Sequence, residues 1–348
     1  MQPFDSLMNM TVSEIENITD ADDDDQDILI PSAQVQFWTY LVLGIPSLLC
    51  TLFLLYHLIF DRRLRQQIHN HVVIILLFLC LVILAVDNAL YLDGWRTGHG
   101  NSFPPSAGVC LVWWFIDYGF YGAISVFLVW ASFERHLIVF HRRRFLTTQR
   151  QIFCFHYLPL VSISIALVGF YLGTIVFPPC TNIFHFDSLA CGSYPCYQDI
   201  SWLNTWDYLF NGVLCNILEA VFSISLLFRA VCRRCYSQRR FHWKKYRKMT
   251  VQLLSISTLS LTINLPQSLI VLVKQINPNL SDFGIYVEPY FFYFTGYIIL
   301  LLPFVCLGCL PELWPRSLCL CRRPRHTIGP MTLTFTAGQT VLVRSKNN

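Results

Sequence analysis

Long apolar runs alternate with short polar segments along the chain, and seven runs are long enough to cross a membrane as helices. They cover residues 35–60, 71–92, 108–133, 152–177, 203–231, 250–273 and 286–310, and charged residues or proline and glycine bound each of them. A hydrocarbon layer about 30 Å thick needs roughly 20 apolar residues at 1.5 Å each. The pattern therefore predicts an all-α membrane protein whose bundle of seven transmembrane helices occupies residues 35–310. The fifth run is the least apolar, because it carries Asp207 and Glu219.

Composition excludes an ordinary soluble domain. Hydrophobic residues make up 54% of the 348 residues and charged residues 13%, and the mean hydropathy is +0.48. Soluble domains are typically about 25% charged. Residues 1–34 lack the basic segment and short apolar core of a cleaved signal peptide. We therefore expect the first apolar run to start translocation and the tail before it to persist.

The basic residues set the orientation of the bundle. Of the 25 lysines and arginines, all but Arg96 and Lys274 fall on the side that carries the first, second and third inner loops and the C-terminal tail. The positive-inside rule makes that side cytoplasmic and the N-terminus extracellular. The acidic tail of residues 1–34 contains glycosylation sequons at Asn9 and Asn17, which only an outer segment could use. Its aspartate run 22–25 is typical of disorder or of a segment that attracts cations.

The third apolar run carries the most informative spacing. Cys110, Asp117 and Arg135 are separated by 7 and 18 residues, so that at 100° per residue they fall within roughly 20° of one line on a straight helix. Cys110 would lie at the extracellular rim, Asp117 roughly 10 Å deeper, and Glu134-Arg135-His136 at the cytoplasmic end. Arg135 could anchor the helix at the interface or meet a partner there.

In these residues the chain resembles the rhodopsin-like (class A) G-protein-coupled receptors. Their third helix begins with a disulfide-bonded cysteine and ends in an Asp/Glu-Arg-Tyr motif at the spacing seen from Cys110 to Arg135. The resemblance extends over about residues 35–320 and includes prolines in the sixth and seventh spans, at Pro266 and Pro303. Residues 311–323 resemble the short amphipathic eighth helix of that family, followed by a cytoplasmic tail within 311–348.

The match is to a divergent member. The sixth span reads Asn264-Leu265-Pro266, where the family has a tryptophan two residues before the proline. The seventh reads Pro303-Phe304-Val305-Cys306 in place of Asn-Pro-x-x-Tyr, and Cys80 stands where a buried aspartate is usual. The family's sodium site on that aspartate and its tryptophan and tyrosine switches are therefore not expected here.

The resemblance implies a receptor that activates a heterotrimeric G protein from the plasma membrane. An extracellular ligand would favour a state in which the sixth span swings outward and opens a cytoplasmic cleft at Glu134, Arg135 and His136. Pro266, Pro303 and the neighbouring Asn264 are the candidate pivots, although prolines are also ordinary in membrane helices. Threonines in the tail permit a receptor kinase and arrestin as further partners.

Acidic residues inside the spans are the candidates for ligand binding. Such residues are costly in a membrane and usually face the bundle, which selects Asp87, Asp117 and Glu219. In amine receptors of the family, an aspartate seven residues after the disulfide cysteine pairs with the ligand ammonium, a role that Asp117 would take here. The alternative is an aspartate held by tyrosines such as Tyr121 or Tyr293. The ligand is expected to be a cationic amine or a basic neuropeptide.

Four cysteines fall in outer segments, where an oxidising compartment lets them pair in three ways. These are Cys110, Cys180, Cys191 and Cys196. The resemblance implies that Cys110 pairs into the second outer loop. The preferred pairing is Cys110–Cys196 with Cys180–Cys191, and Cys110–Cys191 leaves a comparable path.

On the cytoplasmic side, Cys319 and Cys321 lie beside arginines and are candidates for palmitoylation or remain free thiols.

A seven-span transporter or channel would favour inverted repeats or a polar stripe of full depth, and neither is present in the sequence. An enzyme is not expected, since the histidines near the spans, His57, His71 and His156, lack metal-ligand spacing. We expect no cofactor. An orphan or non-signalling receptor-like protein remains the alternative, because the switch motifs are altered.

Overall fold

The computed structural model describes residues 31–97, 106–140, 148–186, 189–192, 194–236, 243–276 and 287–310, together with Leu313. The chain divides into two units, Met1–Pro311 and Glu312–Asn348, and all of the helices described below belong to the first. All regular structure in the described ranges is helical, which confirms the predicted all-α class. Residues 1–30 of the tail with Asn9 and Asn17, the expected eighth helix, and Cys319 and Cys321 lie outside the described residues.

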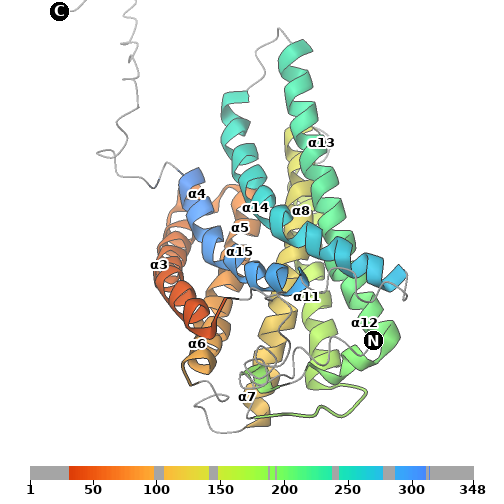
Figure 1. The fold of residues 1–348 in the computed structure, drawn as a ribbon. Coiled ribbons are helices and arrows are strands. Elements are labelled where there is room, and N and C mark those ends of the chain that lie inside the picture. Colours follow the sequence, from red (N-terminus) through yellow and green to blue (C-terminus); the bar gives the residue numbers. More distant parts are fainter. Residues whose placement is uncertain are drawn as a thin grey trace, which may run out of the picture. The chain divides into compact units, whose positions relative to one another are not determined.

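Six helices in the described ranges are long and apolar enough to cross a membrane, as a multi-pass membrane protein requires (Figure 1). The first is α3 (Ala33–Phe60). The second joins α5 (Ile68–Val82), η1 (Ile83–Asp87) and α6 (Asn88–Thr97), and the third joins α7 (Ala107–Trp114), η2 (Phe115–Phe120) and α8 (Tyr121–Phe140). The fourth joins α10 (Gln149–Ile152), η3 (Phe153–Tyr157), α11 (Leu158–Tyr171) and η4 (Leu172–Val176). The fifth joins α12 (Ser201–Trp206), η7 (Asp207–Val213) and α13 (Leu214–Tyr236), and the sixth lies within α14 (Trp243–Ile276).

The last helix of this unit, α15 (Glu288–Cys309), has 22 residues. Its apolar part, Tyr293–Cys309, is shorter than the other six. It packs against α3 and α14, so it belongs to the same bundle. The outer surface of the whole bundle carries large exposed apolar side chains. Among them are Trp38, Ile165 and Ile224, each more than 60% exposed. An apolar outer surface of this kind is what lipid contact requires.

Local sequence signals explain where two helices begin. Thr148 and Gln151 form a capping box at the start of the fourth helix. The hydroxyl of Thr148 accepts from the amide of Gln151 at 3.3 Å, and the side chain of Gln151 accepts from the amide of Thr148 at 3.2 Å. Asp61 caps the short helix α4 (Arg62–Arg65) by accepting from the amide of Arg63 at 2.8 Å. This cap places three arginines directly after the end of α3.

Wide π-helical turns interrupt four of the apolar helices at η1, η2, η3, η4 and η7. Three of these turns contain an aspartate, because Asp87 ends η1, Asp117 lies in η2 and Asp207 begins η7. Hydrogen bonds of a π-turn run from residue i to i+5, so each residue advances by less than the 100° of an α-helix. The single straight line predicted for Cys110, Asp117 and Arg135 is therefore wrong, since η2 lies between its two ends.

Two disulfides close the segment that follows the fourth helix. Cys110 pairs with Cys191 and Cys180 with Cys196, with Cα–Cα distances of 5.9 and 6.0 Å. The preferred pairing of Cys110 with Cys196 is thus wrong, and the alternative path to Cys191 is the one found. Asn182 explains the difference, because its side-chain oxygen accepts from the amide of Cys196 at 3.0 Å and thereby holds Cys196 beside Cys180.

An aromatic core underlies this part of the molecule, which we call the disulfide end. Trp113, Trp114 and Tyr197 are almost completely buried there and pack with Cys110, Cys191 and neighbouring apolar residues. The opposite end of the third helix carries Arg135 and is called the Arg135 end. Within the described ranges, helices alone join the two ends.

Candidate functional site

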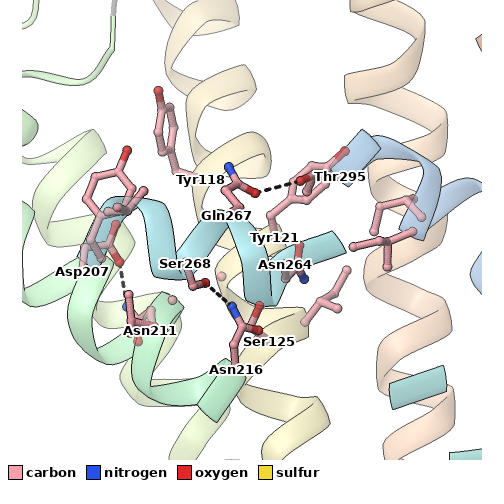
Figure 2. A pocket seen from close by; sticks show the side chains of 18 of the residues that line it. Tyr118, Tyr121, Ser125, Asp207, Asn211, Asn216, Asn264, Gln267, Ser268 and Thr295 are labelled. Carbon is pink, nitrogen blue, oxygen red and sulfur yellow. Dashed lines mark hydrogen bonds between the residues drawn. The ribbon is translucent and has the colours of Figure 1, made fainter. Parts of the chain in front are cut away.

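A polar cavity of about 190 Å³ lies among the third, fourth, fifth, sixth and seventh helices in chain order (Figure 2). Tyr121 and Gly122 line it from α8, Asp207 from η7, Gln267 from α14 and Thr295 from α15. Hydroxyl, carboxamide and carboxylate groups from helices far apart in sequence thus face one space. Concave sites with a few convergent polar groups are the usual places for small ligands.

Asp207 is the carboxylate of this cavity. Its Oδ1 accepts from the hydroxyl of Tyr171 at 2.9 Å and from Nδ2 of Asn211 at 2.7 Å. Its Oδ2 accepts from the hydroxyl of Tyr197 at 2.9 Å. A carboxylate has about four lone-pair positions, so Oδ2 keeps one for a further donor. Among the described residues no basic side chain forms an ion pair with Asp207 within 4 Å.

Carboxamides tie the helices around the cavity together. Asn216 donates to the hydroxyl of Ser268 at 2.6 Å and so connects α13 with α14, while Thr295 donates to Oε1 of Gln267 at 3.1 Å and connects α15 with α14 (Figure 2). The side-chain oxygen of Asn216 is buried without a hydrogen-bond partner. Since an unpaired buried acceptor is costly, a ligand that supplies an N–H or O–H donor would be favoured at this wall.

The two predicted ligand aspartates lie beside the cavity rather than in its wall. Asp87 is 2% exposed and accepts from the indole of Trp113 at 2.8 Å and from the hydroxyl of Tyr121 at 3.5 Å. Asp117 accepts from the hydroxyl of Tyr91 at 3.5 Å, and no residue of the cavity wall is an aspartate other than Asp207. Tyr121, by contrast, lines the cavity as predicted.

Tyr293, the fourth predicted ligand residue, serves the contact between α3 and α15. Its hydroxyl lies 2.7 Å from that of Tyr297 and 3.1 Å from that of Thr39, and its carbonyl accepts from Tyr40 at 2.9 Å. Gly296 makes this approach possible, because an added Cβ would lie only 2.0 Å from the hydroxyl of Tyr40. Tyr293 does not line the cavity.

Sequence reasoning missed Asp207 as a residue of the cavity wall, although the signal is present in the sequence. The fifth run carries Asp207, but the acids that the sequence selects for ligand binding are Asp87, Asp117 and Glu219. Asn211 and Asn216 lie four and nine residues after Asp207. The fifth run therefore combines an acid with two carboxamides. That clustering could have identified the site.

At the Arg135 end, a chain of hydrogen bonds occupies Glu134. Its Oε1 bonds Nδ1 of His156, and Nε2 of His156 lies 2.8 Å from Nδ1 of His71. Nε2 of His71 lies 2.9 Å from the carbonyl of Arg65. Glu134 and His156 are both buried. Glu134 is therefore held by the fourth helix, and not by a salt bridge to its neighbour Arg135.

Arg135 is buried, at 2% exposed, and none of the described residues forms a hydrogen bond with its Nη1. Cys306 and Cys309 of α15 lie near its guanidinium and offer only weak acceptors. His136 contacts the carbonyl of Phe222 in α13 through Nε2, at 2.8 Å. The predicted triplet Glu134-Arg135-His136 is thus brought together inside α8, with each member directed to a different neighbouring helix.

The predicted pivots lie inside continuous helices. α14 runs through Pro266 and α15 through Pro303 without a break, and the two halves of α14 run in different directions (Figure 1). Proline removes one helical hydrogen bond and permits such a bend. Asn264, one turn before Ser268, lines the cavity and donates to the hydroxyl of Ser260 at 3.3 Å.

No protein-family model matches this chain, and no match to it was found among curated proteins. The class of the protein must therefore be argued from its own residues. Groups of three or more histidine, cysteine, aspartate or glutamate side chains suited to a metal ion are absent from the described residues.

Proposed function

We propose that this chain is a divergent rhodopsin-like G-protein-coupled receptor with seven membrane-spanning helices. The cavity between its helices, with Asp207 in the wall, is the single observation that carries the proposal. The seventh span is α15, whose 22 residues extend about 33 Å at 1.5 Å each. The distribution of lysine and arginine supports an N-terminus on the side away from the cytoplasm, and the proposed receptor would act in the plasma membrane.

The proposed ligand is a cationic amine or a basic peptide. Asp207 offers a carboxylate without a basic partner within ion-pair distance among the described residues. The unpaired oxygen of Asn216 offers an acceptor deeper in the same wall. A protonated amine with additional N–H donors satisfies both groups, whereas an anionic ligand would meet Asp207 with like charge.

The proposed signal runs from the cavity to the Arg135 end along α14. Asn264, Gln267 and Ser268 of α14 line the cavity, and the same helix extends to Trp243 on the cytoplasmic side. A ligand that binds one arrangement of α14 more tightly than another shifts the population toward that arrangement. The bend associated with Pro266 separates the ligand-contacting half from the cytoplasmic half, which suits it as the pivot.

Nucleotide exchange tests the proposed function directly. Membranes that contain the full chain would be mixed with purified heterotrimeric G proteins and a panel of amines and basic peptides, and uptake of a non-hydrolysable GTP analogue would be measured. At least one agonist is expected to raise uptake above that of membranes without the chain. Uptake at the control level, basal and under every agonist, from a chain that reaches the cell surface would instead indicate a non-signalling receptor-like protein.

Filling the cavity should weaken agonist binding. Gly212 lines the cavity and an added Cβ would meet no atom within 4 Å, so Gly212→Leu places its side chain in the free space. Overlap with a ligand typically costs about 1–3 kcal/mol, which raises the agonist concentration for half-maximal exchange about tenfold or more. Gly173→Leu is the matched control, since Gly173 is equally open but exposed on η4. Equal potency in both variants would exclude this cavity as the ligand site.

The partner of Glu134 should set the basal activity. His156→Ala removes the histidine that holds Glu134. The freed carboxylate of Glu134 would then pair with the neighbouring Arg135, which is the residue proposed to contact the G protein. Hydrogen bonds to charged groups contribute about 1.5–3 kcal/mol, so basal exchange is expected to fall about tenfold. His71→Ala keeps the bond between Glu134 and His156 and should have a smaller effect. The assignment fails if the two variants change basal exchange equally.

A further inference from the structure

A seam of polar side chains lies between α13 and α14 and adjoins the cavity, whose wall also contains Asn216. On α13 it comprises Asn216, Glu219 and Ser223, and on α14 it comprises Ser257 and Ser260. Residues three or four apart share one face of a helix, and α13 packs against α14. These five residues, the Glu219 seam, therefore place one carboxylate, three hydroxyls and one carboxamide between two helices.

The seam is buried and its hydrogen bonding is incomplete. Glu219 and Ser260 are 0% exposed, and Asn216, Ser223 and Ser257 are each no more than 6% exposed. Four of the oxygens lack a hydrogen-bond partner in the part of the chain that the structure describes: Oδ1 of Asn216, Oε1 of Glu219, Oγ of Ser223 and Oγ of Ser257. The other oxygen of Glu219 accepts from Ser260 at a long 3.4 Å. Native interiors seldom leave so many polar atoms unpaired in one place.

The charge of Glu219 and the chemistry of the unpaired oxygens limit the kind of ligand that could bind here. A buried carboxylate in a membrane bundle requires a counter-charge or a proton. No basic side chain among the described residues forms an ion pair with Glu219. Every unpaired atom is an oxygen, the ligand type of hard cations. A single carboxylate balances one positive charge, so a divalent ion would leave an uncompensated charge in the low-dielectric interior.

We propose that the Glu219 seam binds a monovalent hard cation, with sodium as the natural candidate. Glu219 supplies the charge, and the hydroxyls of Ser223 and Ser257 supply neutral ligands. A cation held between α13 and α14 links the two helices. It also lies next to the cavity, because Asn264 of the cavity wall donates to Ser260 at 3.3 Å and Ser260 donates to Glu219. The inference rests on these contacts alone and holds whether or not the chain couples to a G protein.

Thermal unfolding of the purified full chain in detergent tests the site. The melting temperature would be compared in sodium chloride and in N-methyl-D-glucamine chloride at equal ionic strength. A ligand that binds only the folded state stabilises it, and a rise of about 2–4 °C that saturates with sodium is expected. Equal melting temperatures at every sodium concentration would overturn the proposal.

Two variants locate the effect. Glu219→Gln removes the charge while keeping the size of the side chain, and it should abolish the sodium-dependent rise. Asp87→Asn is the matched control: it alters another buried acid, one that already accepts from Trp113 and Tyr121, so the rise should persist. If Glu219→Gln does not fold, Ser223→Ala should raise the half-saturating sodium concentration several-fold. A rise unchanged in Glu219→Gln, or in Ser223→Ala where that variant replaces it, would show that sodium acts elsewhere.

Discussion

If the proposed function holds, replacing Arg135 by alanine is expected to abolish agonist-stimulated nucleotide exchange while the chain still reaches the cell surface. Arg135 is buried at the end of the bundle opposite the disulfides, and its Nη1 has no hydrogen-bond partner among the described residues. Glu134, its neighbour, is already bonded to His156. An unpaired buried guanidinium is costly in a membrane bundle, so a G-protein acceptor group that enters this end gains a strong charge-assisted hydrogen bond. Exchange in membranes with saturating agonist should fall to the level of membranes without the chain.

Arg62→Ala provides the matched control for this experiment. It removes the same charge from the side that is expected to be cytoplasmic, but Arg62 is exposed in the short helix α4. Exchange should remain within about twofold of the parent, because exposed single charges contribute little. An epitope at the N-terminus, stained on intact cells, would report surface expression and test the extracellular N-terminus at once. Stimulated exchange that survives Arg135→Ala would remove the central role assigned to this residue.

Asp207→Asn is expected to weaken a cationic agonist about 100-fold or more and to leave a neutral agonist unchanged. Asparagine keeps the size of the side chain and an oxygen for the hydroxyl of Tyr171 or Tyr197, so the cavity should retain its shape. What is lost is the charge that faces the ligand. Removing one partner of a buried, hydrogen-bonded charge pair costs about 2–5 kcal/mol, and each 1.4 kcal/mol is a factor of ten in affinity. Concentration–response curves of nucleotide exchange would measure the change.

Asp117→Asn makes this experiment decisive between two assignments. The family resemblance favours Asp117 as the counter-ion, whereas the cavity wall contains Asp207 and not Asp117. If Asp207 binds the cation, Asp117→Asn should shift potency by less than about tenfold, as expected for a charge outside the contact. A large loss with Asp117→Asn and a small one with Asp207→Asn would restore the role first predicted for Asp117.

The positions of the membrane helices followed from the sequence because apolar length alone decides them. Residues 152–177 were predicted for the fourth span and the helix covers Gln149–Val176. Capping residues, and not hydrophobicity, place its first residue, since Thr148 and Gln151 close the box there. The third helix extends past the predicted end at Phe133 to Phe140. Glu134, Arg135 and His136 therefore lie within helix and not at its boundary.

The cavity could not be derived in the same way, since it depends on how helices face one another. Hydropathy does not tell how each helix is rotated about its own axis. The expected rotation of 100° per residue also fails across the π-turns that contain Asp87, Asp117 and Asp207. The partner of Glu134 shows the same limit. His156 was recognised near the cytoplasmic end of its span, but its bond to Glu134 joins residues 22 positions apart on two helices. Neither the spacing of residues nor the composition of the chain predicts this hydrogen bond.

The π-turns also affect how this chain is compared with other helical membrane proteins. A wide turn holds one residue more than the α-helical turn it replaces, so in evolutionary terms it behaves as an insertion inside a helix. Residues after Phe115–Phe120 are therefore shifted by one position, relative to the residues before it, from their places in an uninterrupted helix. An alignment that counts onward from Cys110 keeps its register only up to Phe115, and Asp117 already lies inside the turn. Arg135 has to be aligned separately, by counting from the cytoplasmic end.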